Sequence, residues 1–336
     1  MSKLVFFCVG TGGHVFPVKN IVLELIEKGI SSERIIVFTD ARGKRYLNDI
    51  NVKIFTYDFF YSSSGILSYF GKIKKILISV QFVYKILKPL KISFIFTSGA
   101  YIAPIASLIS IILRIKMYSQ EQNIEAGFGN KFASYFSKKV FTSFPDTNNL
   151  QNKKIEFVGP VINKKIESTI KIAGNSDIRI GVQGGSQGSK ELIDFAIKLS
   201  RDKYLNNIHI ICITGTTKDV YEDTESISFV EFYDDMSKYY SVIDLQISRA
   251  GGGALEASYL NIPQILVPYK HGTSNSHQTL NARYLEKIGL AKVLESYDEI
   301  LSFINQFSKG NLDKNNNLNI NNGLHRIVKE LINVEH

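Results

Sequence analysis

The chain has 336 residues, is 44% hydrophobic and 21% charged, and carries a formal net charge of +9. This composition excludes a disordered chain and a polytopic membrane protein, and the length predicts two domains, each with its own core. The two cysteines lie in separate apolar runs, which excludes a disulfide scaffold, and the short first apolar run excludes a signal peptide; we expect a cytoplasmic protein.

Short β-branched runs alternate with amphipathic segments along almost the whole chain. We expect strands at residues 3–9, 34–40, 52–58, 92–98, 139–144, 178–184, 208–214, 228–232, 244–248 and 264–269. We expect helices between them, among others at residues 17–30, 73–88, 190–202 and 279–290. Strands that alternate with helices indicate parallel sheets, so the pattern predicts an α/β protein with two Rossmann-like, doubly wound domains facing a cleft.

The periodic pattern restarts near residue 178, after a Lys- and Asn-rich segment with little periodicity. We therefore expect one domain at residues 1–161 and a second at 162–323. The Asn-rich stretch at 310–323 predicts a loop. A final helix at 324–336 is expected to pack back on the first domain.

Residues 92–113 contain no charged side chain and are long enough to span a bilayer. The first part is β-branched and aromatic, and Gly99 and Pro104 interrupt the run. These features favour a buried strand, a glycine turn and a helix. A membrane-spanning helix is the alternative.

The positive charge is concentrated in the first half of the chain. Residues 1–160 carry 21 Lys and Arg against 10 Asp and Glu, and no acidic residue lies between Asp58 and Glu121. A one-sided field of this kind indicates a polyanionic partner, which is nucleic acid, anionic lipid or a phosphorylated substrate.

Three glycine clusters, at residues 10–13, 184–188 and 251–253, each follow a predicted strand and open a helix. Backbone N–H groups at such a helix start suit a diphosphate or a sugar, although a tight turn alone would also explain each cluster. The dinucleotide fingerprint fails because Val15 stands where its last glycine belongs, while Asp40 at the end of the second strand keeps NAD binding as an alternative. Glu256, about one turn after the third cluster, is placed to accept hydrogen bonds from a ribose diol.

Four segments in order give a resemblance to a known family: GTGGHVFP at 10–17, EQN at 121–123 with Gly127 and Asn130, GGSQG at 184–188, and HQTLNA at 277–282. Together they resemble the MurG family, the lipid II synthase glycosyltransferases, from about residue 10 to 290. The resemblance implies the GT-B fold and an inverting transfer of N-acetylglucosamine. The donor is UDP-N-acetylglucosamine, and the acceptor is the C4 hydroxyl of the undecaprenyl-diphosphate-linked N-acetylmuramyl-pentapeptide of peptidoglycan synthesis.

The family's residue roles carry over where this sequence matches. On the donor side the resemblance implies phosphate, uracil, ribose and sugar contacts from Ser186, Gln187, Tyr233, Glu256, His277, Gln278 and Asn281. On the acceptor side it implies contacts from Thr11, Gly12, Gly13, His14, Tyr101, Glu121 and Asn123.

The sequence departs from the family pattern at several positions. Val9 replaces a glycine, Gln120 replaces a histidine found in many members, and Ile162 stands where the linker usually has an arginine that contacts the diphosphate. The glycine loop before Glu256 is also one residue short. These departures predict weaker donor binding rather than a different class of reaction.

An inverting transfer needs a base for the attacking hydroxyl. His14 is suited to this role, since an imidazole is mostly neutral at pH 7, and a purely binding role is the alternative. Glu121 is the second candidate catalytic residue. Backbone N–H groups and helix dipoles can stabilise the leaving UDP, so no metal and no cofactor are expected.

Three other functions fit parts of the sequence. Another UDP-sugar-dependent lipid glycosyltransferase and a UDP-N-acetylglucosamine 2-epimerase would use the same fold. A non-catalytic nucleotide-sugar-binding subunit is favoured by the departures from the family and disfavoured by the presence of His14, Glu256 and Gln278. An assay for the transfer of labelled sugar to a lipid acceptor distinguishes these functions.

A peripheral membrane contact is predicted near residues 65–90 of the first domain. The predicted patch consists of Ile66, Leu67, Tyr69, Phe70, Lys72, Lys74 and Lys75. From residue 73 on, an apolar stripe at helical spacing is expected to lie mostly in the core. An apolar patch beside cations favours the anionic inner leaflet of the cytoplasmic membrane, approached from the cytoplasmic side, and no nucleic acid is expected as a partner.

Overall fold

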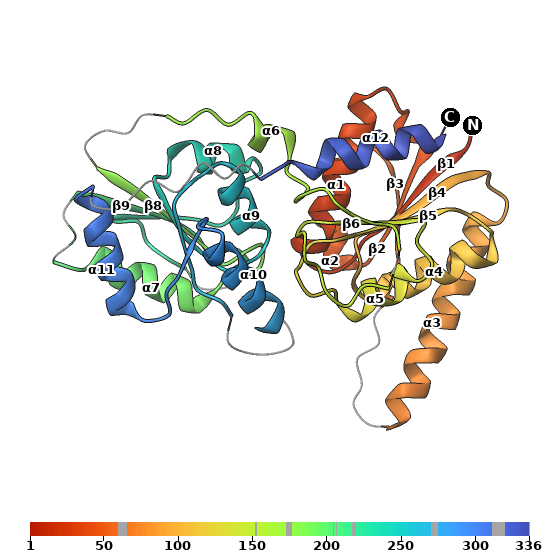
Figure 1. Cartoon of the computed structure of the whole chain (residues 1–336), viewed down its shortest axis with the longest axis horizontal. Coiled ribbons are helices and arrows are strands. Elements are labelled where there is room, and N and C mark those ends of the chain that lie inside the picture. The colour runs from red at the N-terminus through yellow and green to blue at the C-terminus, as the bar shows by residue number, and fades with distance from the viewer. Residues whose placement is uncertain are drawn as a thin grey trace. The chain divides into compact units, whose positions relative to one another are not determined.

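The computed structural model describes residues 1–59, 66–151, 153–172, 177–203, 205, 207–216, 220–269, 275–310 and 320–335. The chain divides into two compact units (Figure 1). The first comprises Met1–Val161 with Asn322–His336, and the second comprises Ile162–Asn321.

The first unit is built on a seven-stranded parallel sheet with the order β3-β2-β1-β4-β5-β6-β7. Its strands are β1 (Lys3–Phe7), β2 (Ile35–Thr39), β3 (Lys53–Thr56), β4 (Ile92–Thr97), β5 (Met117–Glu121), β6 (Lys139–Thr142) and β7 (Ile155–Phe157). In the central strand β1, Phe6 pairs with Val37 on one side and with Phe96 on the other. Alternate strand residues enter two separate core clusters, which places one core on each face of the sheet.

Helices cover both faces of this sheet. They are α1 (Gly12–Glu27), α2 (Ala41–Lys44), α3 (Ile66–Leu87), α4 (Ala103–Ile112), α5 (Phe128–Ser134) and α12 (Gly323–Glu335), with short 3-10 helices η1 (Ser32–Arg34) and η2 (Ala100–Ile102). The core on one face contains residues of α1 and α12, and the core on the other contains residues of α3 and α4.

The C-terminal helix α12 completes the first core although it follows the second unit in sequence. Leu324, Ile327 and Leu331 are buried against strand and α1 residues. At its start a Cβ on Gly323 would lie 2.4 Å from the carbonyl oxygen of Gly159, so only glycine permits this approach. The helix therefore lies on the first unit, as the sequence predicts.

The second unit contains a six-stranded parallel sheet with the order β10-β9-β8-β11-β12-β13. Its strands are β8 (Ile178–Gln183), β9 (Ile208–Ile213), β10 (Ile227–Val230), β11 (Leu245–Ser248), β12 (Gln264–Leu266) and β13 (Lys292–Val293). Its helices are α6 (Lys164–Glu167), α7 (Lys190–Ser200), α8 (Met236–Val242), α9 (Gly252–Tyr259), α10 (Asn275–Lys287) and α11 (Tyr297–Ser308). α7 and α11 pack in one core cluster, and α6, α8 and α9 pack in another.

The predicted fold class, two doubly wound parallel α/β units, is confirmed. Residues 92–113 form the strand, turn and helix that the sequence favours, and no helix in the described part of the chain has an apolar stretch long enough to cross a bilayer. Strands β5, β7 and β13 were not predicted. β5 escapes detection because its sequence, MYSQE, is polar although all five residues are buried.

The predicted start of the first helix at residue 17 is wrong. α1 begins at Gly12 with Thr11 as its N-cap, so Pro17 lies in the second turn. Proline has no backbone N–H group, so residue 17 donates no helical hydrogen bond to the carbonyl oxygen of Gly13. His14 is consequently a residue of the first helical turn rather than of a preceding loop.

We predict that Ile327→Ala destabilises the first unit by about 2–5 kcal/mol, because it opens a cavity in a core that α12 closes. Ile327 is fully buried, whereas Lys329 is an exposed residue of the same helix. Urea unfolding of the full chain measures both variants. Lys329→Ala should change stability by less than about 0.5 kcal/mol, and an equal loss in the two variants would contradict the packing of α12.

Candidate functional site

Each sheet has a point at which the strand order reverses. In the first unit it lies between β1 and β4, and in the second between β8 and β11. Open α/β sheets bind ligands outside the carboxyl ends of the strands at such points. The glycine clusters at 10–13, 184–188 and 251–253 directly follow β1, β8 and β11. The structure therefore offers one candidate site in each unit.

His14 lies at the switch point of the first sheet and is fixed there by residue 98. Its Nδ1 is 2.9 Å from the carbonyl oxygen of Ser98, and the Ser98 hydroxyl donates to the carbonyl oxygen of His14 at 2.6 Å. A carbonyl oxygen can only accept, so Nδ1 carries the proton of the neutral imidazole. Nε2 is then a proton acceptor, which is the state that a general base requires.

Asp40, at the end of β2, holds the loops of the first site together. Its Oδ1 accepts hydrogen bonds from the backbone N–H groups of Gly10 (3.0 Å) and Gly43 (2.8 Å). Its Oδ2 accepts from Tyr101 Oη at 2.5 Å and from Arg42 Nε at 3.1 Å. Arg42 Nη2 also donates to Tyr101 Oη at 3.2 Å. From the sequence, Asp40 was expected only as a possible NAD ligand, and Arg42 was not predicted.

The hydrogen bonds of this cluster favour the ionised form of the Asp40 carboxyl group. Burial by itself raises the pKa of Asp40, but the hydrogen bonds from Gly10, Tyr101, Gly43 and Arg42 outweigh it and leave the pKa below its usual value. Burial and the neighbouring Asp40 raise the pKa of Tyr101, so its hydroxyl stays protonated. A carboxylate engaged with four protein groups is poorly suited to bind the ribose of NAD.

Glu121, predicted as catalytic, is 2% exposed and holds the loop after β5. Its Oε1 accepts from the backbone N–H groups of Gln122 and Asn123, both at 2.8 Å, and from Asn123 Nδ2 at 3.1 Å. Its Oε2 accepts from Asn130 Nδ2 at 2.8 Å. These four donors favour a role in positioning Asn123 over a role in proton transfer.

Tight packing explains the spacing of the motif at 121–130. A Cβ on Gly129 would lie 1.9 Å from the carbonyl oxygen of Ala100, and a Cβ on Gly99 would lie 2.5 Å from Asn130 Nδ2. Gly99 also has φ +98°, which favours glycine. The motif therefore fixes the segment after β4, which carries Tyr101, against α5. Gly129 was not predicted as part of the motif.

The remaining predicted acceptor residues line the start of α1. Thr11 is extended at the N-cap, and its carbonyl oxygen accepts from the N–H groups of His14 and Val15. Gly12 is buried, whereas Gly13 is exposed with open space around its Cα. This arrangement leaves the first turn of α1 accessible at Gly13.

In the second unit the loop after β8 requires glycine at several points. Gly185 and Gly188 have φ of +82° and +77°, and a Cβ on Gly184 would lie 2.4 Å from Ser189 N. Ser189 caps α7 by accepting from the N–H group of Leu192. The predicted phosphate residues Ser186 and Gln187, half-buried and exposed respectively, lie in this loop.

Arg249, the first residue after β11, is buried and joins three loops of the second site. Its Nη1 donates to the carbonyl oxygens of Val267 (2.9 Å) and Pro268 (3.2 Å). Its Nη2 donates to Ser189 Oγ at 2.9 Å and to Glu191 Oε2 at 2.5 Å. Nothing in the sequence pattern points to this role of Arg249, because such contacts depend on the fold.

Glu256 lies in the second turn of α9 and accepts a hydrogen bond at Oε2 from Tyr240 Oη, at 2.7 Å. Burial raises the pKa of its carboxyl group to about 7, and the bond from Tyr240 opposes this rise. A carboxyl group with a pKa near 7 is partly protonated at physiological pH. A ligand that donates hydrogen bonds to it stabilises the ionised form.

The other predicted donor residues lie around the same strand ends. Gln278 Oε1 accepts from the N–H group of Tyr269 at 3.1 Å, and Asn281, which is buried, donates to the carbonyl oxygen of Ala250 at 3.2 Å. His277 is half-buried in α10, and the half-buried Tyr233 packs its ring on Tyr239 at 5.7 Å. The contact of Asn281 indicates that it positions the glycine loop after β11.

The predicted membrane patch is described only in part. The side chains of Ile66, Leu67, Tyr69, Phe70 and Lys72 lie outside the described residues. Lys74 is exposed. Lys75 pairs with Asp58 at 3.1 Å and lies 5.3 Å from the ring of Tyr57.

The apolar stripe of α3 is only partly in the core. Val80, Val83 and Leu87 are buried as predicted, but Ile73 is 42% and Leu77 60% exposed. The stripe was expected to lie mostly in the core, and Leu77 is an exception to that expectation. One end of α3 extends beyond α4 and α5 (Figure 1). The spacing of apolar residues identifies one face of a helix, but it does not show how much of that face other elements cover.

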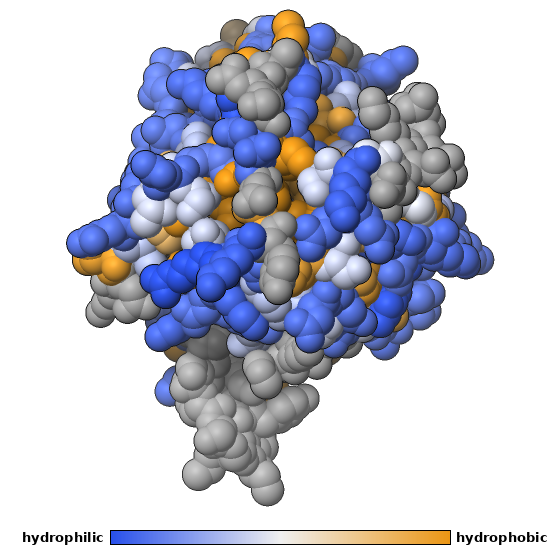
Figure 2. All heavy atoms as spheres, turned by 90° about the vertical axis from the view of Figure 1, so that its left-hand side faces the viewer, coloured by the Kyte–Doolittle hydropathy of each residue, from blue (hydrophilic) through white to orange (hydrophobic). Residues whose placement is uncertain are grey.

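Further apolar side chains are exposed on the helices that follow α3 in the first unit. They are Ile111 and Ile112 at the end of α4 and Phe128, Tyr135 and Phe136 in and after α5. The sequence pattern did not point to these residues. The face seen in Figure 2 is mainly hydrophilic with hydrophobic residues near its middle, and the second unit also exposes apolar side chains, among them Ile170, Ile172 and Val220.

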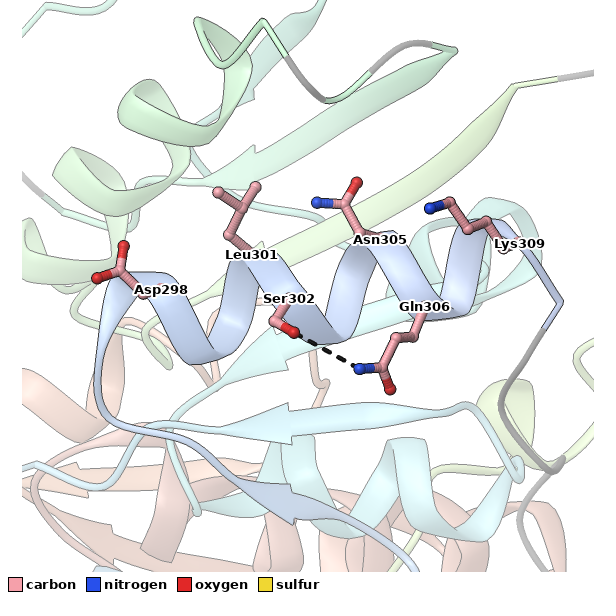
Figure 3. Close-up of a pocket in the computed structure, with 6 residues that line it drawn as sticks. All are labelled: Asp298, Leu301, Ser302, Asn305, Gln306 and Lys309. Atoms are coloured by element: carbon pink, nitrogen blue, oxygen red, sulfur yellow. Dashed lines mark hydrogen bonds between the residues drawn. The ribbon is translucent and has the colours of Figure 1, made fainter.

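A shallow groove along α11 is lined by side chains of that helix alone, including Asp298, Asn305 and Lys309 (Figure 3). Ser302 and Gln306 are hydrogen-bonded to each other within it. One outer face of one helix brings no residues from different elements together, so this groove is not a candidate catalytic site.

Comparison with known families identifies both halves of the chain. The glycosyltransferase family 28 N-terminal domain matches residues 4–142, and the glycosyltransferase family 28 C-terminal domain matches residues 179–331. Among solved structures, MurG from Acinetobacter baumannii superposes with a TM-score of 0.71 at 24% identity, covering 98% of this chain and 99% of that one. A UDP-N-acetylglucosamine 2-epimerase from Neisseria meningitidis gives 0.68 at 14%, covering 99% and 100%. These two likenesses show the fold alone.

Curated relatives give the narrower assignment. Proteins from Sulfurihydrogenibium sp. (strain YO3AOP1) and Rickettsia canadensis (strain McKiel) are each 31% identical to this chain. The alignments cover 89% and 85% of this chain and 86% and 84% of the relatives. Both carry the name UDP-N-acetylglucosamine--N-acetylmuramyl-(pentapeptide) pyrophosphoryl-undecaprenol N-acetylglucosamine transferase. The chain therefore belongs to glycosyltransferase family 28 and, within it, to the MurG family of N-acetylglucosamine transferases, as the motifs indicate.

Proposed function

We propose that this chain is the enzyme that transfers N-acetylglucosamine from UDP-N-acetylglucosamine to the undecaprenyl-diphosphate-linked N-acetylmuramyl-pentapeptide in peptidoglycan synthesis. The relatives at 31% identity are named for this activity. The observation that carries the mechanism is the bond from His14 Nδ1 to the carbonyl oxygen of Ser98, because it leaves Nε2 to accept a proton.

On the acceptor side, His14 acts as the base that takes the proton of the C4 hydroxyl of the muramyl sugar. The acceptor diphosphate lies at the start of α1, where Thr11, Gly12 and Gly13 offer backbone groups. Tyr101 and Asn123 orient the acceptor. Both side chains are held by carboxyl groups, Tyr101 by Asp40 and Asn123 by Glu121.

On the donor side, Glu256 binds the ribose hydroxyls and the backbone of Tyr233 faces the uracil. Ser186 and Gln187 bind the phosphates beside the start of α7. His277 and Gln278 contact the sugar and diphosphate, and Asn281 positions the glycine loop after β11 through the carbonyl group of Ala250. Partial charge at the helix starts stabilises the leaving UDP without proton transfer.

Peripheral attachment to the anionic inner leaflet of the cytoplasmic membrane, from its cytoplasmic side, belongs to this proposal. The lipid-linked acceptor lies in that membrane. Supporting observations are the exposed apolar side chains of α3, α4 and α5 and the exposed Lys74. Apolar residues fringed by cations bind reversibly at a lipid surface.

The proposed transfer is tested with the purified full chain, labelled UDP-N-acetylglucosamine and the lipid-linked acceptor. We expect label in the lipid product and release of UDP. An epimerase would instead produce an isomeric UDP-sugar without the acceptor, and a non-catalytic binding subunit would do neither. Either of these results would contradict the proposal.

In the same assay His14→Ala should lower turnover by roughly 10²–10⁴-fold, because the attacking hydroxyl loses its base. Binding of UDP-N-acetylglucosamine, measured by calorimetry, should remain. His209→Ala is the matched control, since His209 is the second residue of β9 and lies away from the strand's carboxyl end. A loss below tenfold for His14→Ala at saturating donor would leave only a binding role.

Affinity for UDP-N-acetylglucosamine should fall as the pH drops below about 7, the pKa of Glu256. The ribose hydroxyls donate to the ionised carboxylate, so binding is strongest above this pKa and weakens about tenfold per pH unit below it. The intact nucleotide sugar suits this calorimetric test because its diphosphate diester does not ionise near neutrality. Glu256→Gln should bind more weakly with a flat profile, and a flat wild-type profile would refute this assignment.

Binding to anionic vesicles should depend on the first unit. Lys74→Ser should weaken it about fivefold, from a contribution of about 1 kcal/mol per basic residue, and the effect should vanish at high salt. Leu77→Ser should weaken binding to anionic and neutral vesicles alike. Lys309→Ser, which removes an exposed charge from the second unit, is the control in co-sedimentation. Equal effects of Lys74→Ser and Lys309→Ser would contradict the patch.

A further inference from the structure

The donor site rests on a buried hydrogen-bond relay that the transfer reaction as described does not use. It starts at the last residue of β8, where Gln183 Nε2 donates to Tyr240 Oη at 3.2 Å and to Gln246 Oε1 at 2.8 Å. Gln246 Nε2 donates in turn to Ser248 Oγ at 3.0 Å. Gln183, Tyr240 and Gln246 are all buried. Tyr240 in turn donates to Glu256, the residue proposed to bind the ribose of the donor.

The direction of the Tyr240 proton follows from the donors around it. Gln183 Nε2 can only donate, so the Tyr240 oxygen accepts there and its own proton points elsewhere. Two acceptors lie within reach, Glu256 Oε2 at 2.7 Å and the carbonyl oxygen of Gly253 at 3.3 Å. The nearer acceptor is a carboxylate, and a charge-assisted bond is the stronger of the two.

We propose that Tyr240 is a positioning residue for the donor: it orients the Glu256 carboxylate toward the ribose and favours its ionised form. The inference rests on the proposed function, since Glu256 is its ribose ligand. When Glu256 is protonated, the Tyr240 proton turns to the carbonyl oxygen of Gly253. When Glu256 is ionised, the proton returns to Oε2 and leaves Oε1 for the ligand.

The glycine at 253 is part of this arrangement. A Cβ on Gly253 would lie 2.7 Å from both Gln183 Nε2 and Gln183 Oε1, so a side chain there would displace the amide that orients Tyr240. Gln246 Nε2 also donates to the carbonyl oxygen of Gly253 at 3.2 Å. Gly253 therefore leaves room for the Gln183 and Gln246 side chains next to the start of α9.

Within the described part of the chain, Tyr240 is the titratable group that contacts Glu256, and Tyr239 lies next to Tyr240. Tyr240 and the adjacent Tyr239 come from α8, and burial raises the pKa of both hydroxyls far above neutrality. Gln183 and Gln246, from β8 and β11, are uncharged. Burial and the bond from Tyr240 are the causes that set the pKa of Glu256. Loss of that bond should therefore move the pH profile of donor binding to higher pH.

Tyr240→Phe tests the proposal because it removes one hydroxyl and keeps the ring. Affinity of the full chain for UDP-N-acetylglucosamine, measured by calorimetry from pH 5.5 to 8.5, should fall about tenfold at pH 7. The difference from the wild type should narrow as the pH rises, because high pH ionises Glu256 in both proteins. A purely structural role would weaken binding equally at every pH, and that result would overturn the proposal.

Tyr239→Phe is the matched control. Tyr239 is the neighbouring buried tyrosine of α8, and within the described part of the chain its hydroxyl has no hydrogen-bond partner. Its variant should keep the wild-type affinity and pH profile. Identical behaviour of the two Tyr→Phe variants would overturn the proposal.

Two further variants separate the possible failures. In a Glu256→Gln background, Tyr240→Phe should add no pH dependence. Gln183→Met, which removes the amide that orients the hydroxyl, should shift the profile in the same direction if Tyr240→Phe does not fold, and a wild-type profile in Gln183→Met would overturn the proposal. Absence of donor binding by the wild-type chain would overturn the proposed function as well, whereas a wild-type profile in Tyr240→Phe alone would overturn only this inference.

Discussion

A buried polar side chain must find hydrogen-bond partners, and in this protein the loops at the carboxyl ends of the strands supply them. Asp40 accepts hydrogen bonds from the backbone N–H groups of Gly10 and Gly43. Glu121 accepts from those of Gln122 and Asn123. Arg249 donates to the carbonyl groups of Val267 and Pro268. Each loop is thereby tied to a carboxyl or guanidinium group at or next to the end of a strand. The glycines of these loops depend on these ties, because glycine alone does not hold a loop in one conformation.

The two units use the same architecture with different electrostatics. In the first, hydrogen bonds more than offset the burial of Asp40, so its carboxylate is ionised and serves as a fixed support. In the second, burial dominates at Glu256 and raises its pKa to about 7, so a ligand that donates hydrogen bonds would stabilise its ionised form. In the proposed function, His14 and the start of α1 in the first unit serve the acceptor, and Glu256 in the second unit binds the ribose of the donor.

Motif spacing predicted much of this arrangement. The glycine clusters, His14 and Glu256 were found because each follows a β-branched run, and the topology puts such positions at one edge of a sheet. β5 was missed because its buried polar residues hide it, and Arg249 and Tyr240 were given no role because their contacts join elements far apart in sequence. Glu121 was placed in the acceptor site, but its four bonds, which favour positioning over catalysis, could not be read from sequence. Leu77 looked like a core residue because periodicity cannot report that α3 outruns its neighbours.

In the proposed function the second unit recognises the donor through the loops at its switch point. Hydrogen exchange of the full chain with and without UDP-N-acetylglucosamine tests this recognition, since exchange reports local opening of individual segments. We expect the donor to slow exchange in residues 184–189, 249–256 and 277–281, and Glu256→Gln to weaken this protection. Protection confined to residues 10–14 and 98–101 of the first unit would contradict it.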